Sequence, residues 1–212
     1  MANVTNKDFS IRPALPKDVE GAVPLIYSSG PKAWSFVFQE GATSPFDFLQ
    51  KSFVERGNTI SYSNHFVATQ GDSVVGSLIV YKQPVFLLLT VGTAIRILSI
   101  YGSKALRVIT RGLKAEAMIQ PPKSDCLYLG HIAVSESERK KGIAKEMMRY
   151  AISANPKSKK ISLDVSVENE PAISLYKSLG FQVIATRNLP GASGIVPDHH
   201  YMEVERKDFK FS

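Results

Sequence analysis

Hydrophobic and polar positions alternate most regularly over residues 159–167, KKISLDVSV. The apolar set is Ile161, Leu163, Val165 and Val167, and the polar set is Ser162, Asp164 and Ser166. Alternation of this kind predicts a half-buried β-strand. The apolar run 127–134, LYLGHIAV, predicts a second strand, and residues 142–154 between them have apolar side chains at helical spacing. The pattern therefore predicts a right-handed βαβ unit with two parallel strands.

The remaining elements are predicted by the same two periodicities. Strands are expected at 9–12, at 65–69 and 73–81 as a hairpin around QGD, and at 181–187 and 201–205. Helices are expected at 16–30, where the internal Pro24 predicts a break or kink, at 44–57 after a possible Ser44 cap, and at 169–181. A length of 212 residues suits one domain, residues 1–212.

Residues 84–119 lie between the hairpin and the βαβ unit and are predicted to be mostly helical. Their uncharged run ends at Arg96, short of the ~20 residues that a membrane span needs, so no span is expected. The second half is basic and amphipathic, with Lys104, Arg107, Arg111 and Lys114. Packing over the sheet or against a second subunit, as a possible homodimer, is favoured over contact with a membrane.

The net charge and the cysteine content exclude few classes of protein. The net charge of +7 suits phosphorylated ligands, nucleic acid or an anionic membrane and does not choose among them. The single cysteine, Cys126, excludes an intramolecular disulfide framework, and the N-terminus lacks the apolar core of a secretory signal. A cytoplasmic protein is expected. No Cys/His cluster indicates a structural zinc, and we expect no metal.

The stretch RKKGIA, residues 139–144, stands at the start of the predicted 142–154 helix. A helix N-terminus has unpaired N–H groups and a partial positive charge, so cations are unfavourable there unless an anion binds. Gly142 would let an anion approach the backbone closely. A solvated basic loop is the alternative, but the pattern favours a phosphate held mostly by backbone N–H groups.

Three ordered motifs of the second half resemble the GNAT (GCN5-related) N-acetyltransferase family. LGHIAV looks like the fourth strand of that family, and RKKGIA fits its Arg/Gln-x-x-Gly-x-Gly/Ala phosphate loop. NEPAISLYKSLGF is similar to its Asn-x-x-Ala-x-x-x-Tyr-x-x-x-Gly-Phe helix. The resemblance implies an α/β (α+β) fold: a mixed, largely antiparallel sheet of six or seven strands flanked by helices. Residues 84–119 then form a helical insertion before the fourth strand.

The resemblance also implies acetyl-CoA as the acetyl donor. Its pyrophosphate would lie on the loop from Arg139 to Lys145, and its pantetheine arm on the backbone of Ile132 and Val134, where the family's fourth and fifth strands separate. Asn169 would be both a helix cap and a cofactor contact. The Tyr176 hydroxyl would protonate the departing thiolate, against the alternative of a packed aromatic ring. The implied cofactor-binding residues are Ile132, Ala133, Val134, Arg139, Lys140, Lys141, Gly142, Ile143, Ala144, Lys145, Asn169, Ala172 and Tyr176.

The general base is left open by the sequence. Counting back from Val134 by twos places Ile132, Gly130 and Tyr128 on the face toward the acceptor, and neither Gly130 nor Tyr128 is a base at neutral pH. His131 has the opposite parity, so a packed histidine is expected unless a bulge rotates it. The other candidates for the general base, each acting through water, are Asp125, Glu40, His199 and His200. Alternatively, the amine loses its proton to solvent through a chain of water molecules.

The expected function is direct acetyl transfer to a primary amine of a small molecule, an amino acid or a peptide. The acceptor end of the cleft is expected to be walled by the first two helices, the loop 191–200 and the insertion. The insertion brings Phe86, Ile97 and Tyr101, an apolar lining with few carboxylates, so a polyamine ranks lower. Two alternatives remain: a catalytically silent CoA or acyl-CoA sensor, and a binder of membrane surface or nucleic acid through the basic 96–114 helix, although nucleic acid is not expected.

Overall fold

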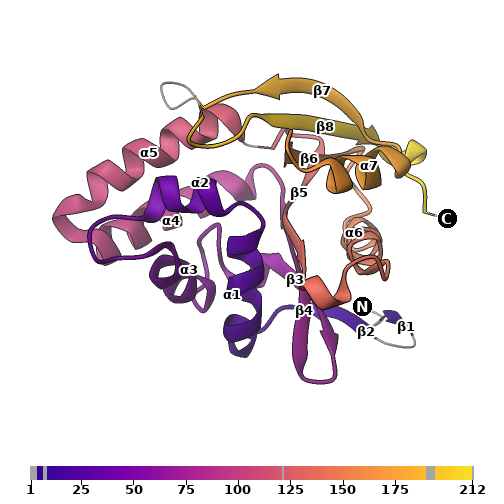
Figure 1. The fold of residues 1–212 in the computed structure, drawn as a ribbon, viewed down its shortest axis with the longest axis horizontal. Coiled ribbons are helices and arrows are strands. Elements are labelled where there is room, and N and C mark those ends of the chain that lie inside the picture. Colours follow the sequence, from indigo (N-terminus) through magenta and orange to yellow (C-terminus); the bar gives the residue numbers. More distant parts are fainter. Residues whose placement is uncertain (1–3, 7–8, 121, 190–193, 212) are drawn as a thin grey trace.

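The computed structural model describes residues 4–6, 9–120, 122–189 and 194–211, and its centre is one β-sheet (Figure 1). The strand order is β1-β2-β3-β4-β5-β6-β8-β7, and only β5 and β6 pair in parallel. The strands are β1 (Val4–Asn6), β2 (Phe9–Pro13), β3 (His65–Gln70), β4 (Ser73–Tyr81), β5 (Cys126–Val134), β6 (Lys160–Ser166), β7 (Gln182–Arg187) and β8 (His199–Glu205). The predicted fold class is confirmed. Seven strands have five or more residues, and the three-residue β1 extends the edge of the sheet.

Helices cover both faces of this sheet. They are α1 (Val19–Ser28), α2 (Pro31–Phe38), α3 (Pro45–Phe53), α4 (Val85–Tyr101), α5 (Ala105–Met118), α6 (Ile143–Ser153) and α7 (Glu170–Ser178). Figure 1 shows α6 and α7 on one side of β5 and the first five helices on the other. Each side has its own hydrophobic core, because β5 and β6 direct alternate side chains to opposite faces.

The core on the α6 side follows from the two periodicities of the sequence. Ile143, Met147 and Ala151 recur at helical spacing and are at most 1% exposed. They pack in one cluster with alternate strand residues, among them Leu127 and Leu163. The predicted βαβ unit is present, and α6 connects its two parallel strands.

Two local predictions have opposite outcomes. Ser44 is the N-cap of α3, where its hydroxyl accepts a hydrogen bond from the Asp47 N–H (3.2 Å). Pro24, by contrast, neither ends nor divides α1, which runs from Val19 to Ser28. A proline removes one backbone donor, and Ala22, Val23 and Ile26 of this helix offset that loss by packing in the core.

The insertion is mostly helical, as predicted, and its two helices pack against each other. α5 also contacts α2, and α4 contacts α3, so the pair closes one end of the α1–α3 layer. By length and composition alone, Val85–Met118 is the one helical segment among the described residues that could cross a membrane. The structure instead folds it back on itself at Gly102, whose φ is +53°.

Candidate active site

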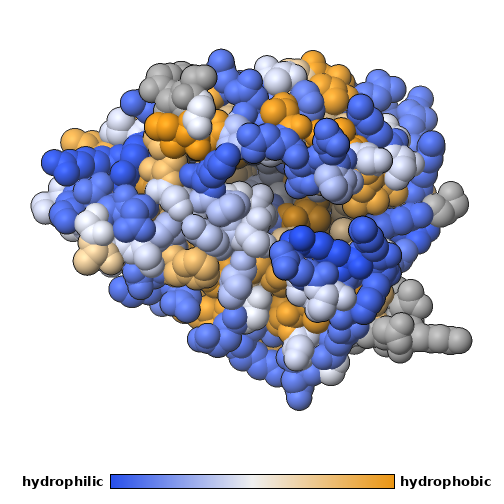
Figure 2. All heavy atoms as spheres, in the orientation of Figure 1, coloured by the Kyte–Doolittle hydropathy of each residue, from blue (hydrophilic) through white to orange (hydrophobic). Residues whose placement is uncertain are grey.

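A cavity of about 400 Å³ lies where β5 and β6 separate. Backbone pairing of these two strands covers only the first three residues of β5, ending at Tyr128 opposite Ser162. Beyond this point Gly130, His131 and Ile132 line the cavity from one side, and Asp164 and Val165 line it from the other. Figure 2 looks onto this side of the molecule, where a recess with hydrophobic residues at its floor lies between hydrophilic rims. The separation leaves the edge of β5 available to an extended ligand.

A β-bulge in β5 decides which side chains face this cavity. Ile79 pairs with Gly130 and Ser77 pairs with Ala133, so His131 and Ile132 together lie opposite Leu78. His131 is the bulged residue and has a φ of +47°. The prediction that Ile132 and Val134 share a face with Gly130 is therefore wrong. Both pack against the α6 core, and His131 turns toward the opposite side.

His131 lies in a group of aromatic rings at the cavity wall. Its ring centroid is 5.0 Å from Trp34, 5.9 Å from His65 and 6.3 Å from Tyr81. Burial, together with the nearby His65, lowers the pKa of His131 to about 3. A neutral imidazole with so low a pKa is a weak base. Its Nδ1 is buried and has no hydrogen-bond partner in the described part of the chain.

Tyr176 reaches the cavity from α7. Tyr176 is 6% exposed, and its ring centroid lies 5.9 Å from the ring centroid of Phe181. Burial raises the pKa of the phenol well above its ordinary value, so the hydroxyl stays protonated at neutral pH. Within the described ranges the hydroxyl has no hydrogen-bond partner, and the residue borders the cavity. The position suits a proton donor.

Asp164 is the carboxylate that the analysis of the sequence missed. It points from the polar face of β6 into the cavity, and its side chain is only 2% exposed. Tyr128 donates a hydrogen bond to its Oδ2 (3.1 Å), and Arg187 Nη1 lies 3.7 Å from its Oδ1. Burial raises the pKa of Asp164 to about 7, against the opposing effects of Arg187 and Tyr128. A carboxylate that titrates near neutrality can accept a proton there.

The alternation of β6 contained a signal for Asp164 that could have been used. Among the polar positions of that strand it is the only ionisable one between Lys160 and Ser166. The strand also lies beside the predicted cofactor strand. Glu116 of α5 was missed as well; it borders the far end of the cavity, and burial raises its pKa.

The other base candidates separate into two groups. His199 borders the cavity, its Nδ1 lies 2.8 Å from the Pro197 carbonyl oxygen, and burial lowers its pKa. His200 points elsewhere and pairs with Thr186 (2.9 Å). Glu40 is engaged with Arg111 (2.9 Å) and Arg107 (3.4 Å). Neither Glu40 nor the exposed Asp125 borders the cavity.

The predicted phosphate loop has the backbone of an anion-binding turn. Lys140 has a φ of +64° and Gly142 a φ of +82°, and α6 begins at the next residue. A left-handed residue directly before a right-handed helix directs neighbouring backbone N–H groups toward one point. Two of its cationic side chains are already paired, Lys141 with Glu138 (3.0 Å) and Arg139 with Glu136 (3.6 Å). This leaves the backbone as the main element for binding an anion.

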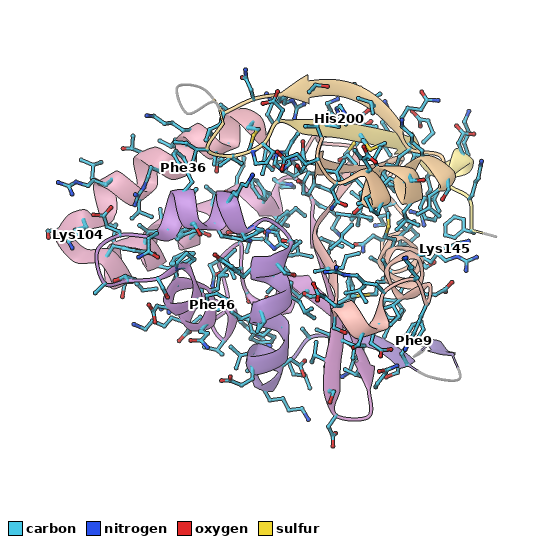
Figure 3. The ribbon with its side chains drawn as sticks, in the orientation of Figure 1. Phe9, Phe36, Phe46, Lys104, Lys145 and His200 are labelled. Carbon is cyan, nitrogen blue, oxygen red and sulfur yellow. The ribbon has the colours of Figure 1, made fainter. Side chains whose placement is uncertain are left out.

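The basic side chains that the sequence singled out are far apart. Figure 3 labels Lys145 beside α6 and Lys104 at the opposite end of the molecule, between α4 and α5. The phosphate loop and the insertion are therefore separate positive regions.

Asn169 is the N-cap of α7, as predicted. Its Oδ1 accepts a hydrogen bond from the Ala172 N–H (3.2 Å), and the residue also borders the cavity. The insertion walls the other end of the cavity through Ala94, Ile97 and Leu113, together with Trp34 and Val37 of α2. Phe86 and Tyr101, also predicted as lining, pack outside it. Residues 191–193 of the predicted loop 191–200 lie outside the described residues. The described residues contain no group of three or more His, Cys, Asp or Glu that could hold a metal.

An open, mostly antiparallel sheet, a cavity at its one parallel pair and a turn with positive φ angles before the adjoining helix agree with the fold that the sequence motifs implied. The Acetyltransferase (GNAT) family matches residues 33–181, and the chain belongs to this family. No curated protein matches the sequence.

Solved structures agree on the fold. An N-acetyltransferase from Staphylococcus aureus Mu50 is 22% identical with a TM-score of 0.69, covering 92% of this chain and 99% of its own. A GCN5-related N-acetyltransferase from Kribbella flavida is 16% identical with a TM-score of 0.56, covering 95% and 99%. Ard1 from Thermoplasma volcanium is 18% identical with a TM-score of 0.54, covering 93% and 97%.

Proposed function

We propose that the protein is an N-acetyltransferase that moves an acetyl group directly from acetyl-CoA to a primary amine. The observation that carries this proposal is one cavity bordered by the free edge of β5, by Asn169 and by Tyr176. The free strand edge suits the amides of a pantetheine arm, and the turn at Gly142 suits a pyrophosphate. No metal takes part in this proposal.

The proposed reaction needs three proton transfers and no acetyl-enzyme. An ammonium group gives a proton to Asp164, and the free amine attacks the thioester carbonyl carbon. The C–N bond forms, the C–S bond breaks, and Tyr176 protonates the leaving thiolate. The nitrogen then loses its second proton, which restores the Tyr176 hydroxyl, and Asp164 releases its proton to solvent. An ammonium ion and acetyl-CoA thus give an amide, CoA and one proton released to solvent. Both reactants held in one cavity make the attack effectively unimolecular.

Titration calorimetry with CoA and acetyl-CoA tests the donor site. Gly142→Ala should weaken binding by roughly tenfold, because an alanine is strained at a φ of +82°. Gly194→Ala is the matched control, since Gly194 has a φ of +85° and equally open surroundings but lies outside the phosphate loop. No binding of CoA at millimolar concentration in low salt would reject the proposal.

Release of free thiol tests the transfer itself. Acetyl-CoA binding with only slow hydrolysis, and no acceptor that accelerates thiol release, would instead favour the silent sensor. A cytoplasmic location stays part of the proposal and is supported by the one cysteine, which is buried and free. The possible homodimer is tested by sedimentation.

A further inference from the structure

The far half of the cavity is not explained by an acetyl donor. Beyond Gly130 and Asp164 it continues between α2, α4 and α5, where the lining is mainly aliphatic and aromatic. The side chains that matter most here are Trp34, Val37, Phe38, Ile97, Ile109 and Leu113. For scale, a dry apolar cavity of about 150 Å³ holds a benzene ring. A volume of about 400 Å³ therefore has room for the end of a pantetheine arm and an apolar acceptor.

The charged side chains that line this cavity are all acidic, and Arg187 lies behind Asp164, outside the lining. The chain has 26 lysines and arginines, yet none of them is among the described residues that line the cavity. The lining does contain two carboxyl groups, Asp164 and Glu116. The Oδ1 atom of Asp164 is buried without a hydrogen-bond partner in the described ranges, and Arg187 Nη1 at 3.7 Å is too distant to donate one. An ammonium group would satisfy this oxygen.

An acceptor with its own carboxylate fits poorly in the same space. Its negative charge would lie near Asp164 or Glu116, or else be buried among apolar side chains without a cation to pair with. Burying an unpaired charge is strongly unfavourable. This argues against a free amino acid, which the sequence had left as an acceptor.

We infer that the acceptor is a primary amine on an apolar alkyl or aryl body without a carboxylate, its ammonium at Asp164 and its body against α4 and α5. This inference rests on the acetyl transfer proposed above. It assigns the insertion a role in acceptor specificity.

The decisive comparison is 2-phenylethylamine against phenylalanine, which share an aromatic body and differ by the α-carboxylate. Fluorescence of Trp34, the only tryptophan, reports binding without acetyl-CoA. Free-thiol release reports transfer. We expect phenylethylamine to exceed phenylalanine at least ~100-fold in kcat/KM and to be the tighter ligand. Asp164→Asn should weaken binding of phenylethylamine.

A charge introduced at the apolar end gives the matched test. Leu113→Arg adds a cation at a lining residue that is 62% exposed, so the substitution is tolerated by the fold. It should lower the ratio of kcat/KM for phenylethylamine to kcat/KM for phenylalanine by about tenfold. Leu106→Arg is the control on the same helix, 74% exposed and outside the lining, and should leave the preference as in wild type.

The outcomes separate this inference from the proposed function. Thiol release with a peptide N-terminus or phenylalanine, at rates equal to or above those for phenylethylamine, would keep the transferase and overturn the apolar acceptor. Failure to bind acetyl-CoA would reject the transferase, and a Trp34 response to phenylethylamine alone would still support the apolar amine site. No response of Trp34 and no transfer with phenylethylamine would overturn the inference.

A second, independent feature is an apolar stripe on the outer side of α4. The α4 stripe consists of Val85, Leu87, Leu88, Val91, Ile95 and Leu98, each between 50% and 72% exposed. Their spacing places them on one side of the helix, and α4 contains no acidic residue. A row of exposed aliphatic residues of this length marks a binding surface.

The charges near the α4 stripe indicate what kind of partner binds it. Residues 85–118 contain five basic residues and one acidic residue, Glu116. Exposed Lys82 precedes the stripe, exposed Lys104 follows it, and Arg96 donates a hydrogen bond to the carbonyl of Lys51 beside it (2.8 Å). Two copies paired through α4 would bring like charges together. An anionic lipid surface would attract the same charges.

We propose that the α4 stripe docks the protein on the surface of an anionic membrane without spanning it. Sedimentation with phosphatidylcholine vesicles, with and without phosphatidylglycerol, tests this. Binding should need phosphatidylglycerol, weaken with salt, and fall roughly 100-fold in Leu88→Ser/Ile95→Ser. Val183→Ser/Ile184→Ser alters exposed aliphatic residues on β7 and should bind as wild type does. A dimer dispersed by the α4 substitutions, or no binding to either vesicle, would overturn the proposal.

Discussion

Replacing Asp164 by asparagine should change how the stability of the protein depends on pH. In the folded protein the pKa of Asp164 is raised from 3.8 to about 7, because its side chain is 2% exposed and the charged form loses its hydration. Between these two values the folded state binds more protons at this position than the unfolded state. The contribution of Asp164 therefore lowers the free energy of unfolding as pH rises from about 4 to about 7, and is constant above.

The magnitude follows from the difference of about three pH units. At ~1.36 kcal/mol per unit, the wild type should lose on the order of 4 kcal/mol across this window from Asp164 alone. The histidines oppose this slope. Burial lowers the pKa of His65 to about 4 and that of His131 to about 3, so their contributions fall as pH decreases. The difference between wild type and Asp164→Asn removes these shared contributions and isolates the aspartate.

Urea unfolding followed by Trp34 fluorescence, at pH values from 4 to 8, provides the measurement. Asp164→Asn should gain stability relative to wild type as pH rises to 7. Tyr128→Phe removes the hydrogen bond that lowers the pKa of Asp164. In this variant the free energy of unfolding should therefore continue to fall to a higher pH than in wild type. Parallel pH profiles for wild type and Asp164→Asn would refute the raised pKa and, with it, Asp164 as a base poised near neutrality.

Three further predictions concern the same structure. Tyr176→Phe should lower kcat by ~10²-fold, or ~2.7 kcal/mol, where chemistry limits the rate, and an unchanged kcat would remove Tyr176 from proton donation. Cys126→Ala should retain activity, since the thiol is buried away from the cavity; an acetylated enzyme isolated from wild type but not from this variant would contradict direct transfer. Gly92→Ala should destabilise the protein by several kcal/mol because its Cβ would lie 1.7 Å from the Gly57 carbonyl oxygen. Gly112→Ala, whose nearest contact is 3.8 Å, should stabilise it by up to ~1 kcal/mol, and equal unfolding midpoints for the two variants would show that the close approach in α4 is absent.

Elements that depend on neighbouring residues could be predicted before the structure was known. The alternation of β6, the helical spacing of α6 and the Asn169 and Ser44 caps depend on neighbouring residues, so period and capping chemistry were sufficient to predict them. The turn before α6 and the helix containing Tyr176 were predicted for the same reason, since each belongs to a continuous motif. The helical nature of residues 84–119 also followed from their composition and spacing.

Only the tertiary structure decided which side chains meet in the cavity. The bulge at His131 depends on the pairing of β5 with β4, a contact between residues more than 50 positions apart, and strict alternation therefore gave the wrong face for Ile132 and Val134. Asp164 acquires a pKa near neutrality from burial and from Tyr128 and Arg187, which lie on other strands. The exclusion of every lysine and arginine from the described cavity lining is likewise a property of packing, because charge counted along a chain does not report where the charges lie.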